Sequence, residues 1–429
     1  MERTLGFIDE HPGYILSLIV VLAIAVIFAL NVESLPPTMS SGETDSWWAI
    51  GLNLIHGHGY SLCLPRYFPF CGPNNQVSAA REPLPVLLFA AIAWIGRESL
   101  WVAVGVEFII YLAVLIVIYF LTREWGGVRA ALIAAFFWAM YIPAIELVPQ
   151  VSGDLLATLL VSLGILKVLR ARKTKNLLDW VSAGFFLGLA VISRSGTLAI
   201  AFAVVCGVAI EKWGERSNWR DSVYPALILF SLVVLLMAPW LIRNKLALGR
   251  PVLGSSLVGY NLYRHNYIIT GNDYFRYVGG VEGQAGIDAV IAQRTDLLGT
   301  ENEAQMDLVY RQEALKIIRA HPIRYGLLSA FRFFPLWFNL TYFKAYGKSI
   351  PHEDYWIMVM QGVLLILAIL GLRGNLARVW PLWVSVLAFS LVYMAVDSRL
   401  LYLLPAMPLV MSLGGVGVTV MLRWSPEAG

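Results

Sequence analysis

The chain has 429 residues; 58% are apolar, only 14% are charged, and the formal net charge is +4. Soluble domains average about 45–50% apolar and about 25% charged residues. This composition therefore excludes an ordinary soluble enzyme, a disordered protein and a disulfide scaffold, and it is typical of a polytopic membrane protein. The small net charge gives no reason to expect a nucleic-acid partner.

The first apolar segment is predicted to be a membrane helix that the mature protein keeps, over residues 14–30. The preceding leader carries Glu2, Asp9 and Glu10 against a single Arg3, and no small-residue cleavage site follows the apolar run. A secretory signal peptide would have a basic leader and such a site.

Ten apolar runs are predicted to cross the membrane: 14–31, 100–121, 130–147, 154–169, 179–193, 195–210, 225–241, 355–372, 380–396 and 400–422. A further run, 83–96, is too short. As a helix it would extend about 20 Å, whereas the hydrocarbon core of a bilayer is about 30 Å thick.

The charges between these runs predict their orientation. The cation-rich short loops hold Arg123 and Arg129, then Arg170 to Lys175, then Lys212, Arg216 and Arg220, then Arg373 and Arg378. Cytoplasmic loops are enriched in Lys and Arg. All four loops lie on that side only if run 83–96 does not cross, so we expect it to lie in the outer interface, begun by Pro83 and Pro85.

The predicted fold is therefore an all-α polytopic membrane protein of about ten transmembrane helices with external interfacial helices. Residues 1–241 form an N-terminal membrane module whose first external loop is 32–99. Residues 242–354 form a second external loop, with a helix expected over 301–318 and an interfacial segment over 331–343. Residues 355–429 form the last membrane helices. We expect a multi-pass protein of the plasma (inner) membrane with its site on the external, periplasmic side.

The first external loop predicts a short amphipathic helix. Ser41 or Asp45 can cap a helix that runs to about His56 and ends at Gly57. Trp47 and Trp48 fall on its apolar face, as expected for tryptophans at headgroup depth. Asp45 then stands at the helix start beside the membrane, either as a simple cap or as a functional carboxylate.

The same segment carries a resemblance to a known family. An acidic residue, an aromatic residue and then Gly57-His58-Gly59-Tyr60 resemble the first-loop motif of GT-C polyprenyl-phosphate-sugar glycosyltransferases, the clan of protein O-mannosyltransferases and aminoarabinose transferases. Further segments are similar in order: Arg81 to Pro85, Ser152-Gly153-Asp154, Ile192-Ser193-Arg194, Pro239 to Asn244 with Gly249-Arg250-Pro251, and Ser398 to Pro405. The chain departs from the family where many relatives have two adjacent acids, since Thr44 separates Glu43 from Asp45.

The resemblance implies sugar transfer from a polyprenyl-phosphate donor to a lipid, glycan or protein acceptor. Such a reaction needs a base beside the attacking group. Asp45 or Glu43 fits this role. Asp154 is a second acidic candidate, which could hold a metal or orient the acceptor, or could simply cap a helix together with Ser152.

The leaving phosphate needs positive charge, for which Arg194, Arg243 and Arg399 are candidates. Each also has a structural interpretation: Arg194 and Arg243 could extend to the headgroups, and Arg399 could pair with Asp397. Tyr260, Tyr263 and His265 could bind the sugar or acceptor, or belong to an interfacial belt or a small core.

Three further predictions concern metals and cysteines. No cofactor is predicted firmly; a divalent ion held by carboxylates is compatible with the sequence, while His56 and His58 lack a third ligand for zinc. Cys63 and Cys71 are expected to form a disulfide outside the cytoplasm, and Cys206 to pack in a span.

Two other functions compete with sugar transfer. A transporter would show repeated halves and broken helices at the midplane, which this sequence does not clearly show. An O-antigen ligase or polymerase would depend on a large late loop. The acidic first loop favours the glycosyltransferase.

Overall fold

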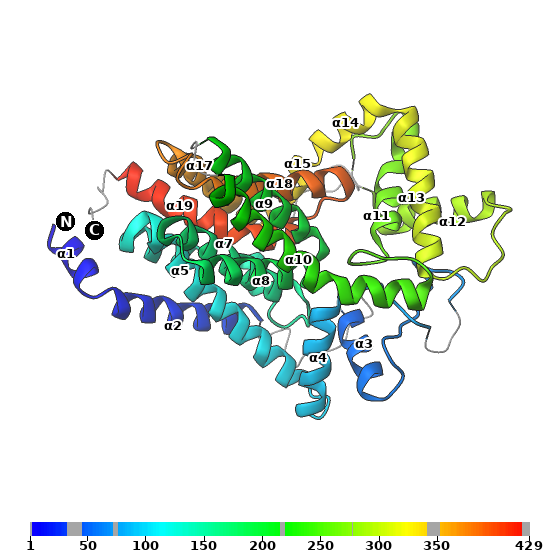
Figure 1. Ribbon diagram of the computed structural model, residues 1–429, viewed down its shortest axis with the longest axis horizontal. Helices are drawn as coiled ribbons and strands as arrows, with labels where there is room; N and C mark the ends of the chain where they lie inside the picture. Colours follow the sequence, from blue (N-terminus) through cyan, green and yellow to red (C-terminus); the bar gives the residue numbers. More distant parts are fainter. Residues whose placement is uncertain are drawn as a thin grey trace.

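The computed structural model describes residues 2–31, 45–71, 76–214, 219–276, 278–340 and 352–422, and of Asp45 it describes the backbone alone. Helices build these ranges, and an isolated bridge joins Ser61 to Val77. Most helices run along one bundle, and α11–α14 lie at the end of the bundle opposite the two termini (Figure 1). We call α11–α14 together with residues 56–71, 76–80 and 249–257 the cap.

The predicted spans correspond to the helices of the bundle. These are α2 (Pro12–Asn31), α5 (Leu100–Ala139), α7 (Asp154–Thr174), α8 (Leu177–Ser193), α9 (Leu198–Gly214), α10 (Trp219–Leu248), α17 (His352–Leu372), α18 (Trp380–Val396) and η4 with α19 (Leu400–Ala406 and Met407–Met421). A short α1 (Glu2–Glu10) precedes them. Within the described ranges, five stretches are long and apolar enough to cross a membrane: Pro12–Asn31, Leu100–Ala139, Val223–Leu248, Asp354–Leu372 and Leu400–Met421. Shorter apolar helices pack among them.

A hairpin inside α5 accounts for two of the predicted spans. Gly127 has a φ of 83°, a conformation that favours glycine. The two halves fold back on each other, since the Tyr111 hydroxyl donates to the Trp138 carbonyl and the Trp138 indole donates to the Tyr111 carbonyl. The second half is shorter than the predicted run 130–147. It ends at Ala139, and a separate turn, α6 (Ile142–Ile145), follows around Pro143, which cannot donate to a helix.

The cationic loops gather at one end of the bundle, as the charge pattern predicts. Arg172 pairs with Glu211 and donates to the carbonyl of Arg378 at 2.6 Å. Arg170 pairs with Glu124, and Arg129 pairs with Asp9 beside the N-terminus. The side chains of Lys212, Arg216 and Arg220 lie outside the described residues. The two termini lie at this same end (Figure 1).

Two short helices, α3 (Asp45–Ile55) and α4 (Pro83–Ile95), pack together beside the cap end of the bundle. Helix α4 has the predicted bounds and lies across the direction of α2 (Figure 1). The expected position of the α3 tryptophans is wrong. Trp47 and Trp48 are buried against α4 instead of facing headgroups, because Val86, Phe89 and Ala93 offer them a protein surface.

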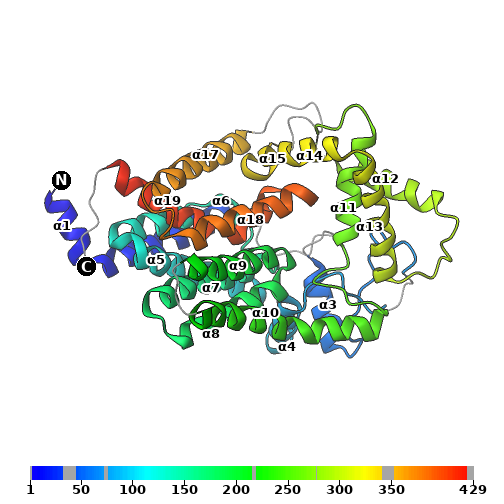
Figure 2. The same ribbon diagram turned by 45° about the horizontal axis from the view of Figure 1, so that its top comes forward.

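The cap has its own apolar core. It contains α11 (Val258–Asn266), η3 (Tyr267–Thr270), α12 (Gly280–Gln293), α13 (Glu303–Ala320) and α14 (Pro322–Phe331). Asn302 and Gln305 form a capping box that starts α13 close to the predicted residue 301. The predicted interfacial segment 331–343 is partly wrong. Figure 2 shows α15 (Phe333–Phe338) beside the end of α18, and its Leu336 and Trp337 are buried in the bundle core; residues 341–343 lie outside the described ranges.

Helix α10 continues past its predicted end at residue 241. It contains Pro225 and Pro239 yet runs to Leu248, because the returning chain bonds to its last turns. The Trp240 indole donates to the carbonyl of Gly254 at 2.8 Å, and the Asn244 amide donates to the carbonyl of Val252 at 3.0 Å. This extension carries Arg243 beyond the bundle, against the first loop.

Candidate functional site

A cavity of about 1490 Å³ lies between the cap end of the bundle and the cap. We divide its wall into two parts. The bundle wall holds the charged side chains Arg81, Glu82, Glu146, Asp154, Arg194, Asp354, Asp397 and Arg399. The cap wall holds Arg66, Arg250, Arg264, Asp307 and Arg311. Two predicted candidates, Asp154 and Arg194, therefore meet in one place, and Arg399 joins them.

Asp154 and Arg194 form an ion pair on the bundle wall, with each side chain 13% exposed. Asp154 is the first residue of α7, where the helix dipole favours a carboxylate. It does not cap the helix, because Gly153 holds the cap position. Arg194 also donates to the Tyr393 hydroxyl at 3.0 Å and lies over the Tyr402 ring at 5.0 Å. It therefore faces protein and the cavity and not the headgroups.

Glu82 is a site residue that the sequence argument missed. Its carboxylate accepts from the Ser195 backbone N–H at 3.0 Å and from the Ser195 hydroxyl at 2.7 Å, so it fixes the turn that presents Arg194. The neighbouring Arg81 bonds to the Ser46 hydroxyl and lies 4.3 Å above the Trp47 ring. The sequence contains an indication of this role, because two charged residues directly before an apolar run are energetically costly unless they bind a partner.

Asp397 connects several groups of the bundle wall. Its Oδ2 accepts from the Tyr402 hydroxyl at 3.2 Å and lies 3.2 Å from Nε2 of His265 and 3.7 Å from Nε of Arg399. Arg399 is 34% exposed and lines the cavity, so it pairs locally with Asp397 and still faces the open space. Asp397 itself was considered only as a local partner of Arg399.

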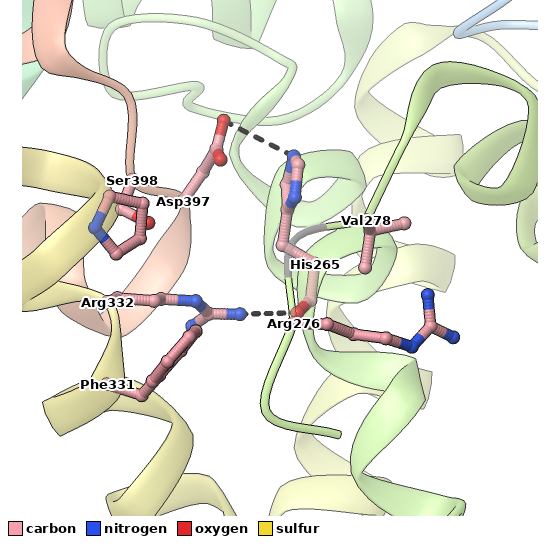
Figure 3. Close-up of a pocket in the computed structure, with 8 residues that line it drawn as sticks. His265, Arg276, Val278, Phe331, Arg332, Asp397 and Ser398 are labelled. Atoms are coloured by element: carbon pink, nitrogen blue, oxygen red, sulfur yellow. Dashed lines mark hydrogen bonds and ion pairs between the residues drawn. The ribbon is translucent and has the colours of Figure 1, made fainter. Parts of the chain in front are cut away.

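His265 belongs to a buried joint between cap and bundle rather than to the cavity wall. His265 lines a small void of about 10 Å³ together with Arg332, Asp397 and Ser398. Figure 3 shows Asp397 pointing at the His265 ring and Arg332 pointing at the His265 backbone. Arg332 also donates to the Met394 and Ala395 carbonyls, each at 3.2 Å. Burial lowers the pKa of His265 to about 3, so this imidazole is neutral.

The predicted tyrosines lie inside the cap. Tyr260 is buried in edge-to-face contacts with Tyr67 and Tyr310. Tyr263 stacks on Tyr267, with ring centroids 5.9 Å apart. Neither lines the cavity. Their aromatic rings build the core of the cap, and we leave them out of the proposed site.

Arg243 holds the first loop in place. Its Nη1 donates to the Ser78 carbonyl at 2.6 Å, its Nη2 donates to the Tyr60 carbonyl at 3.0 Å, and its guanidinium lies 4.9 Å from the Tyr60 ring centre. Glu303 holds the same loop from the cap, accepting from Ala79 N–H, Ser78 and Ser256, each at 2.8 Å. Arg243 is absent from the cavity wall, so it is a positioning residue in this structure.

The first loop also contains the expected disulfide. Cys63 and Cys71 are bonded, with their Cα atoms 5.6 Å apart. The closed loop includes Arg66 and Tyr67, which both line the cavity. Cys206, within α9, is a half-buried free thiol.

The predicted catalytic acids of the first loop are described only in part. Glu43 and the side chain of Asp45 lie outside the described residues. The backbone of Asp45 begins α3, directly before Ser46, which bonds to Arg81, and Trp47, which lines the cavity. The start of α3 is therefore next to the bundle wall.

The described residues do not form a metal site. They contain no group of three His, Cys, Asp or Glu side chains that could hold an ion. Asp154 is engaged by Arg194, and His56 bonds to the exposed Glu98 at 2.8 Å, outside the cavity lining.

Comparisons with known proteins agree with this architecture. The fold is similar to that of the archaeal oligosaccharyltransferase AglB from Archaeoglobus fulgidus, solved with an inhibitory peptide and a dolichol-phosphate: the TM-score is 0.58 at 16% identity, over 97% of this chain and 51% of that one. The apo form of the Archaeoglobus fulgidus oligosaccharyltransferase gives a TM-score of 0.60 at 16% identity, with the same coverage of both chains. The present chain thus spans about half the length of these proteins.

The described helices form an all-α polytopic membrane fold similar to that of these oligosaccharyltransferases. Residues 80–242 match the family of dolichyl-phosphate-mannose-protein mannosyltransferases. This stretch is less than half of the chain, and the structural likeness at 16% identity concerns the fold. ArnT from Cupriavidus metallidurans, bound to undecaprenyl phosphate, gives a TM-score of only 0.41 at 14% identity over 95% of this chain and 81% of that one, too weak to support an argument. No curated protein matches the sequence.

Proposed function

We propose that this protein transfers a sugar from a polyprenyl-phosphate donor to an acceptor inside the cavity, on the external face of the plasma (inner) membrane. One observation carries the proposal: a single large cavity combines an apolar lining from the membrane helices with the Asp154–Arg194 pair, Glu82 and Arg399. The matched family stretch, residues 80–242, includes three of these four residues.

The apolar part of the bundle wall suits the lipid of the donor. Its side chains come from membrane helices and the turns between them: Ile142, Leu147, Ile357, Val392, Leu400 and Leu401. A polyprenyl chain lying against them would leave its phosphate at the charged part of the wall. Arg399 is partly exposed there and would stabilise the charge that the phosphate gains as the bond between sugar C1 and phosphate oxygen breaks.

The acceptor group would be activated by Asp45. As the acceptor oxygen or nitrogen forms its bond to C1, its proton would pass to this carboxylate, and the polyprenyl phosphate would leave. Glu43 is the alternative base, because it lies two residues before Asp45, which begins α3. Asp154 would orient the acceptor, with Arg194 holding its carboxylate in place. The described residues contain no cluster that supports a divalent ion near Asp45.

The charge distribution supports this orientation. The cationic loops and both termini lie at one end of the bundle, and the cavity lies at the other. Since cytoplasmic loops are enriched in Lys and Arg, the cavity would open on the external side. Donor, membrane lipids and acceptor would meet there.

The test is sugar transfer by purified protein in liposomes, using a panel of polyprenyl-phosphate sugars and of lipid, glycan and peptide acceptors. Wild type, Asp45→Asn and the matched control Asp273→Asn would be compared; the Asp273 side chain is 86% exposed in the cap and outside the cavity. Product from wild type and control, but not from Asp45→Asn, is expected. Equal product from all three would remove Asp45 as the base. Movement of the sugar lipid without a new covalent product would overturn the proposal in favour of a transporter.

A further inference from the structure

The cap wall differs from the bundle wall in its charge. Its charged residues are four arginines and a single acid, Asp307. The bundle wall, in contrast, holds five acids and three arginines. Asp307 pairs with Arg311 at 2.7 Å. Arg66, Arg250 and Arg264 have no carboxylate within ion-pair distance among the described residues.

Arg264 is the most informative of these side chains, because it is only 3% exposed. Its Nη1 lies 2.9 Å from Nε2 of the neutral His265, and its Nη2 donates to the Gly279 carbonyl at 3.3 Å. Its Nε has no hydrogen-bond partner. The nearest interacting carboxylate, Asp397, contacts the same His265 nitrogen and forms no direct ion pair with Arg264. A buried cation without a direct ion pair is unfavourable, so this guanidinium at the cavity wall favours a bound anion.

Arg66 converges on the same place from the first loop. Its Nη2 is 3.5 Å from the point where a Cβ on Gly280 would lie, so the guanidinium rests on the first turn of α12. Gly279, the acceptor of Arg264, is the N-cap of that helix. Gly280 itself lines the cavity. The two arginines therefore flank one helix N-terminus.

The N-terminus of α12 adds donors to this pair of cations. The first N–H groups of a helix have no partner within it and favour an anion. The acid of this turn, Glu282, is already engaged by Arg276 in an ion pair, and that pair lowers the pKa of Glu282. No free carboxylate of the described turn competes for the site.

We infer that Arg66, Arg264 and the N-terminus of α12 form an anion-binding subsite that holds a phosphate group of the acceptor. This inference rests on the proposed function, since it assigns the cap wall to the acceptor and the bundle wall to the donor. The phosphate is a recognition group and not the attacking group. Its three oxygens match two guanidinium forks and a helix N-terminus, and Arg250 adds charge at the rim.

The experiment measures phosphate binding in the absence of any donor. The thermal unfolding midpoint of the detergent-solubilised full chain would be followed against inorganic phosphate, with sodium chloride at matched ionic strength. Wild type, Arg66→Gln and the control Arg319→Gln, an exposed arginine of the cap outside the cavity, would be compared. We expect saturable stabilisation by phosphate and a Kd about tenfold higher or more for Arg66→Gln, since it loses a charged hydrogen bond. Arg319→Gln should match wild type.

Two results would overturn the inference: no stabilisation by phosphate beyond that of chloride, or wild-type affinity in Arg66→Gln. Arg66 is exposed, so this variant should fold even if one at Arg264 does not. Competition then distinguishes the source of the phosphate. Displacement by phosphatidic acid in nanodiscs would indicate a lipid acceptor, displacement by glucose 6-phosphate a soluble glycan, and displacement by neither would also overturn the inference. Because this experiment measures binding without turnover, a negative result would not contradict the proposed sugar transfer.

Discussion

The two walls of the cavity use charge in opposite ways. On the bundle wall, Asp154 pairs with Arg194, and Asp397 contacts Arg399, Tyr402 and His265. On the cap wall, Arg66 and Arg264 have no carboxylate partner within the described chain. Paired charges are held in fixed geometry before a ligand arrives, which suits groups that act on reacting atoms. Cations without an ion-pair partner remain available to a charged ligand, which suits recognition.

The largest effect is expected from Asp154→Asn on the bundle wall. Removing the carboxylate leaves Arg194 buried without its counter-ion. It also leaves the acceptor without the group proposed to orient it, so kcat for sugar transfer should fall about a thousandfold. The double variant Asp154→Asn with Arg194→Gln should recover the unfolding midpoint but not the activity. A wild-type kcat in Asp154→Asn alone would show that the Asp154–Arg194 pair is only structural.

The kinetics of Arg399→Gln should distinguish the proposed donor role of the bundle wall from the proposed acceptor role of the cap wall. It removes the charge proposed to stabilise the leaving phosphate, so kcat should fall about a hundredfold or more with a small change in the acceptor KM. Arg66→Gln should do the reverse, raising the acceptor KM and leaving kcat close to wild type. Steady-state rates at varied acceptor concentration would measure both. The contrast fails if the two variants give the same pattern.

Glu303→Ala tests how firmly the cap holds the first loop. Three donors, on Ser78, Ala79 and Ser256, would lose their buried acceptor. We expect the free energy of unfolding of the cap to fall by about 1–3 kcal/mol, seen as faster hydrogen exchange over residues 76–81. Glu301→Ala is the control, because the Glu301 carboxylate makes only exposed contacts with its own turn. Equal exchange in both variants would contradict the role given to Glu303.

The smallest effect is a pH dependence of the buried joint. Burial lowers the pKa of His265 to about 3, whereas an unfolded histidine titrates near 6.5. The unfolded chain therefore binds a proton that the folded chain does not, and stability falls as the pH drops from about 6.5 towards 3. The unfolding midpoint should decline across this window, and His265→Gln should make the decline shallower. An unchanged slope would show that His265 does not control it.

Local patterns predicted much of the fold. The two prolines and the length of run 83–96 predicted α4 with its observed bounds, and the cationic loops predicted which ends of the helices meet. Hydrophobic run length and loop charge are properties of neighbouring residues, so the sequence displays them directly. The break at Ile192-Ser193-Arg194 was also visible, because an arginine interrupts the apolar stretch.

Contacts between distant segments could not be predicted in the same way. Glu82 bonds to Ser195 across more than a hundred residues, and nothing in either segment names the other. Arg243 was expected to face a phosphate, but α10 continues past Pro239 and brings this residue to the carbonyls of the first loop. A cation near a membrane surface looks the same in sequence whether its partner is a ligand or a carbonyl, because only the tertiary fold determines which one is within reach.

The disulfide makes the cap wall depend on the place where the protein matures. Arg66 lies in the small ring that Cys63 and Cys71 close, so the ring sets where this guanidinium points. Disulfides persist only in oxidising compartments. The recognition surface would thus be completed after the loop has been exported, while Asp154 and Arg194, held by helices, require no such step. Newly inserted chains would therefore hold the Asp154–Arg194 pair in place before the cap wall is complete.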